Sequence, residues 1–325
     1  MTTTAPAAFR VTNLVKHFAK RQSLISRLRK VPIFNVPAVD GVSLTLETGK
    51  TLGLVGESGC GKSTLGRTLV GLYTATDGEI SLFDEKVDKQ RTLEQRRTVQ
   101  MIFQDPFSSL NPRMTVGKML TEALLFHKLV EPEKVEAKCK ELLALVGLPE
   151  DSLGSYPRQF SGGQRQRIGI ARALALNPKI LIADEAVSAL DVSVQASVVN
   201  LLMDLKRELG LTMLFISHNI AIVRQVSDRI AVMYLGRIVE IGTTEEVFNS
   251  PSHPYTKLLL SSVPKMHIGS QISDAPAGEL PSLSKEIVGC RFRSRCPVAI
   301  ADCATIDPQL YTITADHQAA CLLVK

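Results

Sequence analysis

A glycine-rich loop between an apolar run and a helix constrains the fold of this chain more than any other feature. The loop extends from Gly56 to Ser63 with the spacing G-x-x-x-x-G-K-S, after the strand-like run Thr51–Val55 and before the helical pattern Leu65–Leu72. Glycines at this spacing let backbone N–H groups turn inward around phosphate oxygens, and the helix adds the positive end of its dipole. The sequence therefore predicts a phosphate-binding loop, at which Lys62 reaches the β and γ phosphates and Ser63 binds Mg²⁺.

Strands and helices alternate after this loop. Apolar runs predict short strands, and apolar residues spaced by three and four predict helices. The expected strands are Val99–Phe103, Ile180–Ala183, Thr212–Ile216 and Arg229–Met233, and the expected helical stretches are Thr115–Val146, Val192–Leu209 and Asn219–Val226. This alternation predicts an α/β fold with a mostly parallel sheet covered on both faces. Past about Gly242, closely spaced prolines predict an irregular extension.

Composition and charge exclude several classes of protein. With 45% hydrophobic and 22% charged residues, the chain of 325 residues has an ordinary globular composition. No apolar run approaches the roughly 18 residues of a membrane span, and the N-terminus lacks a signal-peptide pattern, so we expect the chain in the cytosol. A net charge of +6 fits anionic partners or simply solubility. Without dense Lys/Arg tracts or any Trp, nucleic acid is not indicated.

Polar residues follow three of the expected strands. Asp184 ends an apolar run and is placed to supply a ligand for Mg²⁺, and Glu185 beside it to take a proton from an attacking water. Gln104 and His218 also follow strands, where Gln104 is a candidate for contact with the metal shell or for signalling to a partner. The alternative for the Asp–Glu pair is an ordinary surface pair at a strand end.

A second glycine-rich segment opens a helix at Ser161, Gly162, Gly163 and Gln164. Small residues and a hydroxyl at a helix N-terminus favour anion binding. Two copies of such a chain would be able to hold one nucleotide between the loop of one and this helix of the other. The alternative is a glycine-rich turn with no ligand.

Four cysteines crowd into the last 36 residues, at Cys290, Cys296, Cys303 and Cys321. In a chain without an export signal, such a group favours metal binding over disulfides. Four thiolates are the ligand set of a 4Fe–4S cluster and also of structural zinc. The lack of C-x-x-C pairs favours iron–sulfur, with a structural role, and four free thiols remain an alternative.

In order and spacing, these motifs resemble those of the ATP-binding subunits of ABC transporters. The correspondence covers Walker A (Gly56–Thr64), the Q-loop (Gln104), the signature (Phe160–Gln164), Walker B (Ile180–Glu185), the D-loop (Ser188–Asp191) and the H-loop (His218). More narrowly, the chain resembles the dipeptide/oligopeptide permease branch, through Gln104–Arg113, His253–Thr256 and Gly289–Pro297. It is similar to the second ATPase of the pair in such systems, and the branch favours the 4Fe–4S assignment further.

The resemblance implies a P-loop NTPase core of ABC ATPase type. It places a nucleotide-binding domain at 10–250, with a helical subdomain at about 105–177, and a cysteine-rich permease-type extension at 251–325. It assigns catalysis to Glu185, His218 and Gln104, and Mg²⁺ to Ser63, Gln104 and Asp184. The expected nucleotide ligands are Phe18, Gly56, Ser58, Gly59, Cys60, Gly61, Lys62, Ser63, Thr64, Ser161, Gly162, Gly163, Gln164 and Asp191, with Phe18 stacking on adenine.

The same resemblance implies partners and a function. ATP hydrolysis would power the import of dipeptides or oligopeptides, with ATP between two ATPase subunits at the cytoplasmic face of the cell membrane. The implied partners are a paralogous ATPase subunit, two membrane-spanning permease subunits and an extracytoplasmic substrate-binding protein. The alternatives are a nickel, opine or oligosaccharide importer, or a soluble ABC ATPase of translation or DNA repair. The segment Lys20–Pro37 is expected to be a solvated loop or a basic amphipathic turn near lipid headgroups.

Overall fold

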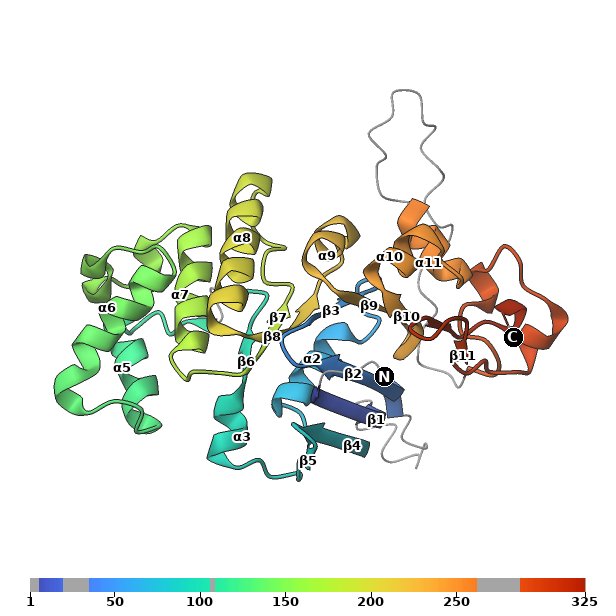
Figure 1. The fold of residues 1–325 in the computed structure, drawn as a ribbon, viewed down its shortest axis with the longest axis horizontal. Coiled ribbons are helices and arrows are strands. Elements are labelled where there is room, and N and C mark those ends of the chain that lie inside the picture. Colours follow the sequence, from blue (N-terminus) through green and yellow to red (C-terminus); the bar gives the residue numbers. More distant parts are fainter. Residues whose placement is uncertain (1–5, 20–34, 106–108, 262–286, 325) are drawn as a thin grey trace, which may run out of the picture.

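An eight-stranded sheet forms the centre of the computed structural model, which describes residues 6–19, 35–105, 109–261 and 287–324 (Figure 1). The strand order is β11-β12-β10-β9-β3-β8-β7-β6, and the strands from β9 to β6 are parallel. These parallel strands are β3 (Thr51–Val55), β6 (Val99–Ile102), β7 (Ile180–Asp184), β8 (Thr212–Ile216) and β9 (Arg229–Tyr234). Their continuous apolar runs suit strands that are covered on both faces.

Alternate residues of the central strands point to opposite faces of the sheet. In β7, Leu181 and Ala183 belong to one hydrophobic cluster, whereas Ile180 and Ile182 belong to the other. The first cluster includes residues of α8 (Val192–Leu209) and α9 (Ile220–Val226), and the second includes residues of α2 (Lys62–Val70). In Figure 1, α8 and α9 accordingly lie above the sheet and α2 below it.

A smaller antiparallel sheet covers the α2 side, in the order β2-β1-β4-β5. Its strands are β1 (Ala7–Ala19), β2 (Asn35–Glu47), β4 (Asp77–Leu82) and β5 (Glu85–Lys86), and α3 (Leu93–Thr98) follows them. No sequence pattern predicted this sheet. The solvated loop or amphipathic turn expected at Lys20–Pro37 lies outside the described residues from position 20 to 34. The last three residues of that segment begin β2.

A helical lobe forms one end of the molecule, at the left of Figure 1. It contains α5 (Val116–Phe126), α6 (Val135–Leu145) and α7 (Gly162–Leu174), with single 3₁₀ turns at Pro132–Lys134, Glu150–Gly154 and Pro157–Gln159. The predicted helical stretch Thr115–Val146 is therefore two helices. Within the described ranges, no helix is long and apolar enough to cross a membrane.

The C-terminal extension, where it is described, joins the central sheet. Strand β12 (Gln318–Ala319) pairs antiparallel with β10 (Arg237–Thr243), and β11 (Tyr311–Thr312) pairs with β12. Helix α10 (Thr244–Asn249) lies between β10 and the extension, and the extension contributes α11 (Pro254–Ser261) and short turns at Arg293–Arg295, Ala301–Ala304 and Leu322–Val324. The proline-rich composition predicted an irregular chain, whereas long-range pairing forms short strands at Tyr311–Thr312 and Gln318–Ala319.

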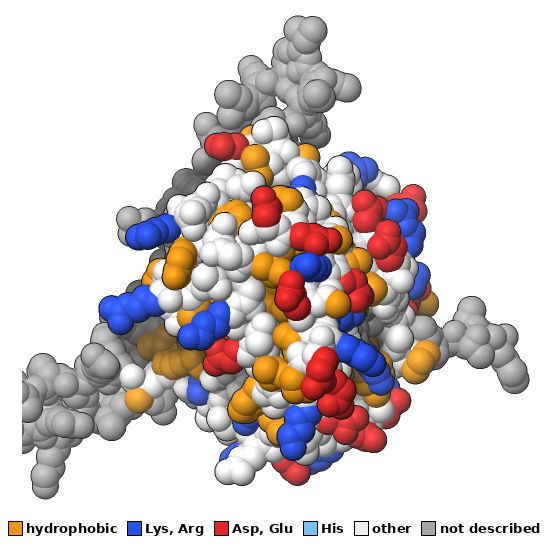
Figure 2. Space-filling view, turned by 90° about the vertical axis from the view of Figure 1, so that its left-hand side faces the viewer, with side chains coloured by type: hydrophobic (Ala, Val, Ile, Leu, Met, Phe, Trp, Pro, Cys, Tyr) orange, Lys and Arg blue, Asp and Glu red, His pale blue; other side chains and the backbone are white. Residues whose placement is uncertain are grey.

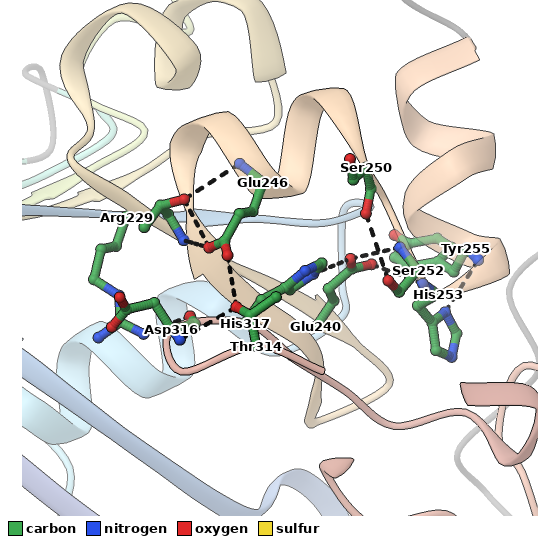
Figure 3. Close-up of polar contacts among 11 residues, drawn as sticks. Arg229, Glu240, Glu246, Ser250, Ser252, His253, Tyr255, Thr314, Asp316 and His317 are labelled. Carbon is green, nitrogen blue, oxygen red and sulfur yellow. Dashed lines mark hydrogen bonds and ion pairs between the residues drawn. The ribbon is translucent and has the colours of Figure 1, made fainter. Parts of the chain in front are cut away.

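A buried carboxylate fixes the extension to β10 (Figure 3). Glu240 is 0% exposed and accepts hydrogen bonds from the backbone N–H groups of Ser252 (2.7 Å) and His253 (2.9 Å). Its carboxylate also lies 2.7 Å from Nε2 of His317, which comes from the far end of the chain. Burial lowers the pKa of His253 to about 4, and its Nδ1 accepts a hydrogen bond from the N–H of Tyr255 (3.0 Å).

Candidate nucleotide site

The Walker A loop packs so closely on its neighbours that two of its positions admit only glycine. Gly56 has φ +154° and Gly61 has φ +111°. A Cβ atom at Gly56 would lie 2.2 Å from the carbonyl oxygen of Met233, and one at Gly61 would lie 2.1 Å from that of Ala38. The loop is thus seated against β9 and β2, with its residues Ser58 and Gly59 exposed at the tip.

Lys62 folds back over this loop. Its ammonium group donates to the carbonyl oxygens of Gly56 (2.8 Å) and Glu57 (2.9 Å), and the residue is only 4% exposed. Burial raises the pKa of the Cys60 thiol, which lies 3.8 Å from the same ammonium group. A buried ammonium held by neutral carbonyl acceptors provides the positive charge that phosphate oxygens require.

Ser63 and Asp184 form the region of the site suited to a divalent cation. The carboxylate of Asp184 is fully buried at the end of β7, and its Oδ1 accepts a hydrogen bond from the Ser63 hydroxyl (2.8 Å). Its Oδ2 has no hydrogen-bond partner among the residues that the structure describes. Burial raises the pKa of Asp184, although the Ser63 hydrogen bond acts against this. Oxygen ligands of this type fit Mg²⁺, which would satisfy the orphaned oxygen.

Glu185 lies where three strand ends meet. Its Oε2 accepts a hydrogen bond from the amide of Gln104 (2.7 Å), and its Oε1 lies 3.6 Å from Nδ1 of His218. The backbone of Glu185 is in the left-handed region, with φ +46°, and its N–H donates to the carbonyl of Ile216 (2.9 Å). Strained backbone of this kind is common at functional sites. The structure therefore brings together three polar residues that the sequence placed at separate strand ends.

The signature residues form the N-terminus of α7. The Ser161 hydroxyl accepts from the N–H of Gln164 (3.3 Å), and the Gln164 side chain accepts from the N–H of Ser161 (3.0 Å). A Cβ at Gly163 would lie 2.5 Å from a methyl group of Val194, so glycine permits close contact with α8, whose N-cap is Asp191. In Figure 1, α7 stands in the helical lobe, apart from α2 beneath the sheet.

Phe18, the expected adenine-stacking residue, is 37% exposed on β1. Its ring meets the ring of Tyr73 edge-on, with centroids 5.3 Å apart, and the Lys16 ammonium lies 5.1 Å from its centroid. An aromatic face at the surface suits stacking on a base, and the assignment stays a prediction.

The four C-terminal cysteines line one small cavity, together with His253 and Phe292. The N–H of Cys290 donates to the carbonyl of Cys303 (2.9 Å), and burial raises the pKa of the Cys290 and Cys296 thiols. However, the residues that the structure describes include no group of three or more His, Cys, Asp or Glu side chains arranged to hold a metal ion. The predicted 4Fe–4S or zinc site is therefore not confirmed by the geometry.

The residues that support the Walker A loop were not predicted from the sequence. Glu57, inside the loop, forms an ion pair with Arg295 and a hydrogen bond with Tyr255. Tyr255 and Arg295 fall within His253–Thr256 and Gly289–Pro297, two segments that carry the resemblance to peptide permease ATPases. Their presence in those segments was the available signal, but the pattern alone did not connect them to the loop.

Comparison with known proteins agrees with this geometry. The ABC transporter family model matches residues 39–188, and the model for the oligopeptide/dipeptide transporter C-terminal region matches residues 239–303. The oligopeptide transport ATP-binding protein AppF of Bacillus subtilis is 47% identical over 319 residues, which covers 95% of this chain and 94% of the relative. The oligopeptide transport ATP-binding protein OppF of Salmonella typhimurium is 50% identical over 303 residues, with 90% of each chain covered.

Solved structures show the same fold. A dimeric bacterial ABC transporter cassette superimposes with a TM-score of 0.62 at 28% identity, covering 73% of this chain and 98% of that one. A dimeric ATP-binding cassette in a post-hydrolysis state, bound to ADP and phosphate, gives the same TM-score at 27% identity over the same shares of the two chains. The chain therefore belongs to the ABC transporter ATPases, in the family of oligopeptide transport ATP-binding proteins.

Proposed function

We propose that this chain binds Mg²⁺·ATP at its Walker A and Walker B residues and hydrolyses it to power the import of dipeptides or oligopeptides. The observation that supports ATP hydrolysis is that Gln104 and His218 both contact Glu185, beside the buried Ser63–Asp184 pair. The oligopeptide transport named for the two relatives supports the peptide cargo.

Different residues of the site have different roles in binding and hydrolysis. Lys62 and the backbone N–H groups from Gly59 to Thr64 bind the phosphates, and Ser63, Asp184 and Gln104 hold the cation. Mg²⁺ held by these residues would supply positive charge to the phosphates. Glu185 accepts a proton from the attacking water, and its contacts with Gln104 and His218 orient the carboxylate for that role.

A second ATPase subunit completes each site. The signature residues of this chain, Ser161, Gly162, Gly163 and Gln164 with Asp191, would act on the nucleotide held by the partner. The dimeric state of the solved relatives supports this arrangement, as does the position of α7 apart from α2. We further propose that the partner is a paralogous subunit.

The helical lobe is the surface that we propose for the permease subunits. A groove there is lined by Asn111, Met119, Glu122, Phe126 and Arg172, and Phe126 is 69% exposed. Figure 2 shows that hydrophobic side chains at this end of the molecule lie among both acidic and basic ones. Docking on two membrane-spanning subunits would place the chain at the cytoplasmic face of the cell membrane, and an extracytoplasmic protein would deliver the substrate.

We also propose that Cys290, Cys296, Cys303 and Cys321 bind a 4Fe–4S cluster, with zinc as the alternative. Their position around one cavity supports this, and sulfur ligation would require the thiols to converge further and lose their protons. Anaerobically purified protein should be brown and contain iron and acid-labile sulfide, both lost in Cys296→Ser. A colourless preparation with stoichiometric zinc would select the alternative, and one without metal would reject both.

Hydrolysis and cargo are tested in the assembled importer. Lys62→Ala should weaken ATP binding, because the buried ammonium is lost. The ATPase activity of the isolated chain should fall on dilution to monomer, because each site needs a partner's signature, and activity per subunit that stays constant would reject the shared site. Stimulation of ATPase activity by peptides, and not by nickel, opines or oligosaccharides, would identify the cargo.

A further inference from the structure

The C-terminal extension holds the second residue of the Walker A loop at two points. Arg295 donates from Nη1 and Nη2 to the two carboxylate oxygens of Glu57, at 2.9 and 3.0 Å. Tyr255 accepts a hydrogen bond at its hydroxyl from the backbone N–H of Glu57, at 2.9 Å. Both the side chain and the backbone of Glu57 are therefore fixed by residues that lie about 200 positions or more away in the sequence.

The two residues that the extension contributes to these contacts are closely packed. The Arg295 side chain is 6% exposed, its guanidinium lies 5.9 Å from the ring of Tyr234, and the contact with Glu57 raises its pKa. Tyr255 is fully buried, with its ring centroid 4.6 Å from that of Tyr234 and 5.4 Å from that of Phe292. A paired, forked arginine on a packed aromatic cluster has little freedom to move.

A continuous set of contacts connects this support to the central sheet. Glu240 on β10 accepts from the N–H of His253, whose Nδ1 accepts from the N–H of Tyr255, and Figure 3 shows these residues in sequence. The Tyr255 hydroxyl then accepts a hydrogen bond from the N–H of Glu57. The loop is thus anchored through the extension to β10, in addition to its own covalent connection with β3.

The extension also contacts the turn between β9 and β10, and this turn binds Cys60 in the loop. Arg291 donates to the carbonyl of Leu235 and to the carboxylate of Asp40. Burial acts to raise the pKa of Asp40, but Arg291 and Arg237 outweigh it and leave that pKa lowered. The residue after Leu235, Gly236, donates its N–H to the carbonyl of Cys60 in the loop (2.8 Å).

We propose that Arg295 and Tyr255 are positioning residues for ATP binding, through which the C-terminal extension sets the nucleotide affinity of this half-site. Without Arg295, the Glu57 carboxylate would be an unpaired negative charge in the loop that must receive phosphates. Without the Tyr255 hydroxyl, a backbone N–H of the same loop would lose its acceptor. A loop already held in its binding geometry has less freedom to lose when ATP binds. This inference rests on the proposed nucleotide site.

The test is equilibrium binding of a fluorescent ATP analogue with Mg²⁺ to the full chain. Arg295→Gln should raise the Kd about tenfold, which corresponds to ~1.4 kcal/mol. In a Glu57→Gln background the same replacement should raise the Kd by no more than about twofold, because coupled residues are not additive. The matched control is Arg293→Gln, since Arg293 is exposed and donates to the carbonyl of Ala304 within its own segment, so its Kd should stay unchanged.

Two further variants separate the possible failures. Tyr255→Phe keeps the buried ring and should raise the Kd about threefold. If Arg295→Gln does not fold, the Kd of Tyr255→Phe tests the proposal in its place. An unchanged Kd in folded Arg295→Gln, an equal rise in Arg293→Gln, or an unchanged Kd in Tyr255→Phe would overturn the proposal. If Lys62→Ala binds the analogue as well as the wild type, the nucleotide site itself is wrongly assigned; if Lys62→Ala abolishes binding while the Arg295 and Tyr255 variants bind normally, only this inference fails.

Discussion

Replacing Glu240 with glutamine should detach the C-terminal extension from the sheet at a measurable cost in stability. The fully buried carboxylate faces three donors, the N–H groups of Ser252 and His253 and the Nε2 of His317. A glutamine amide offers one acceptor oxygen and turns an NH₂ group towards at least one of these donors. An unpaired buried donor costs about 1–3 kcal/mol, and the remaining bonds lose the advantage of a charged acceptor. We expect a total loss of about 3 kcal/mol.

The assay is urea unfolding, followed by circular dichroism and by tyrosine fluorescence because the chain has no Trp. The matched control is Glu246→Gln, since Glu246 also connects the extension to the core through Thr314 but is only partly buried. Glutamine can replace glutamate in the capping box that Glu246 forms with Thr243, so this control should lose no more than about 1 kcal/mol. Equal losses in the two variants, or a loss under about 1 kcal/mol in Glu240→Gln, would refute the reasoning.

Three further predictions concern pH, the loop and the cation. Burial lowers the pKa of His253 from 6.5 to about 4, so the unfolded state gains a proton first as pH falls. The free energy of unfolding should therefore drop by about 2 kcal/mol between pH 7.5 and 5. Urea unfolding measured across this pH range should show a smaller pH dependence of stability in His253→Gln. Gly61→Ala should abolish binding of the fluorescent ATP analogue, since its Cβ would meet the carbonyl of Ala38. Gly210 also has a left-handed φ, but a Cβ there would have no neighbour within 4 Å, so Gly210→Ala should bind the analogue normally. Asp184→Asn should raise the Mg²⁺ concentration for half-maximal ATPase activity about tenfold, because the buried negative charge is lost; an unchanged Mg²⁺ curve would remove Asp184 from the cation site.

Local pattern predicted the parallel half of the fold well. The expected strands Thr51–Val55 and Thr212–Ile216 and the helix Val192–Leu209 have the same bounds in the structure. These elements are continuous apolar runs or long amphipathic helices, whose residues specify them without reference to distant partners. Strand β12 has two residues and exists because it pairs with β10, and no local pattern encodes such a pairing.

The same division applies to the site. Ser63 and Asp184 lie 121 positions apart, and their proximity was expected because the sequence motifs assigned both residues to the same cation. The contact between Glu57 and Arg295 spans 238 positions and was not predicted. An ion pair between two distant charged residues has no sequence signature, because many other pairings of the same residues are equally consistent with the chain.

The Glu185→Gln variant tests the central assignment most directly. Glutamine can keep the contacts with Gln104 and His218, so the geometry and the affinity for Mg²⁺·ATP should be preserved while the general base is lost. The measurement is ATP hydrolysis by the assembled importer, with the partner ATPase subunit inactivated. We predict that the rate falls by about 10²–10⁴-fold while ATP stays bound between the two subunits. Turnover close to that of the wild type would contradict the account.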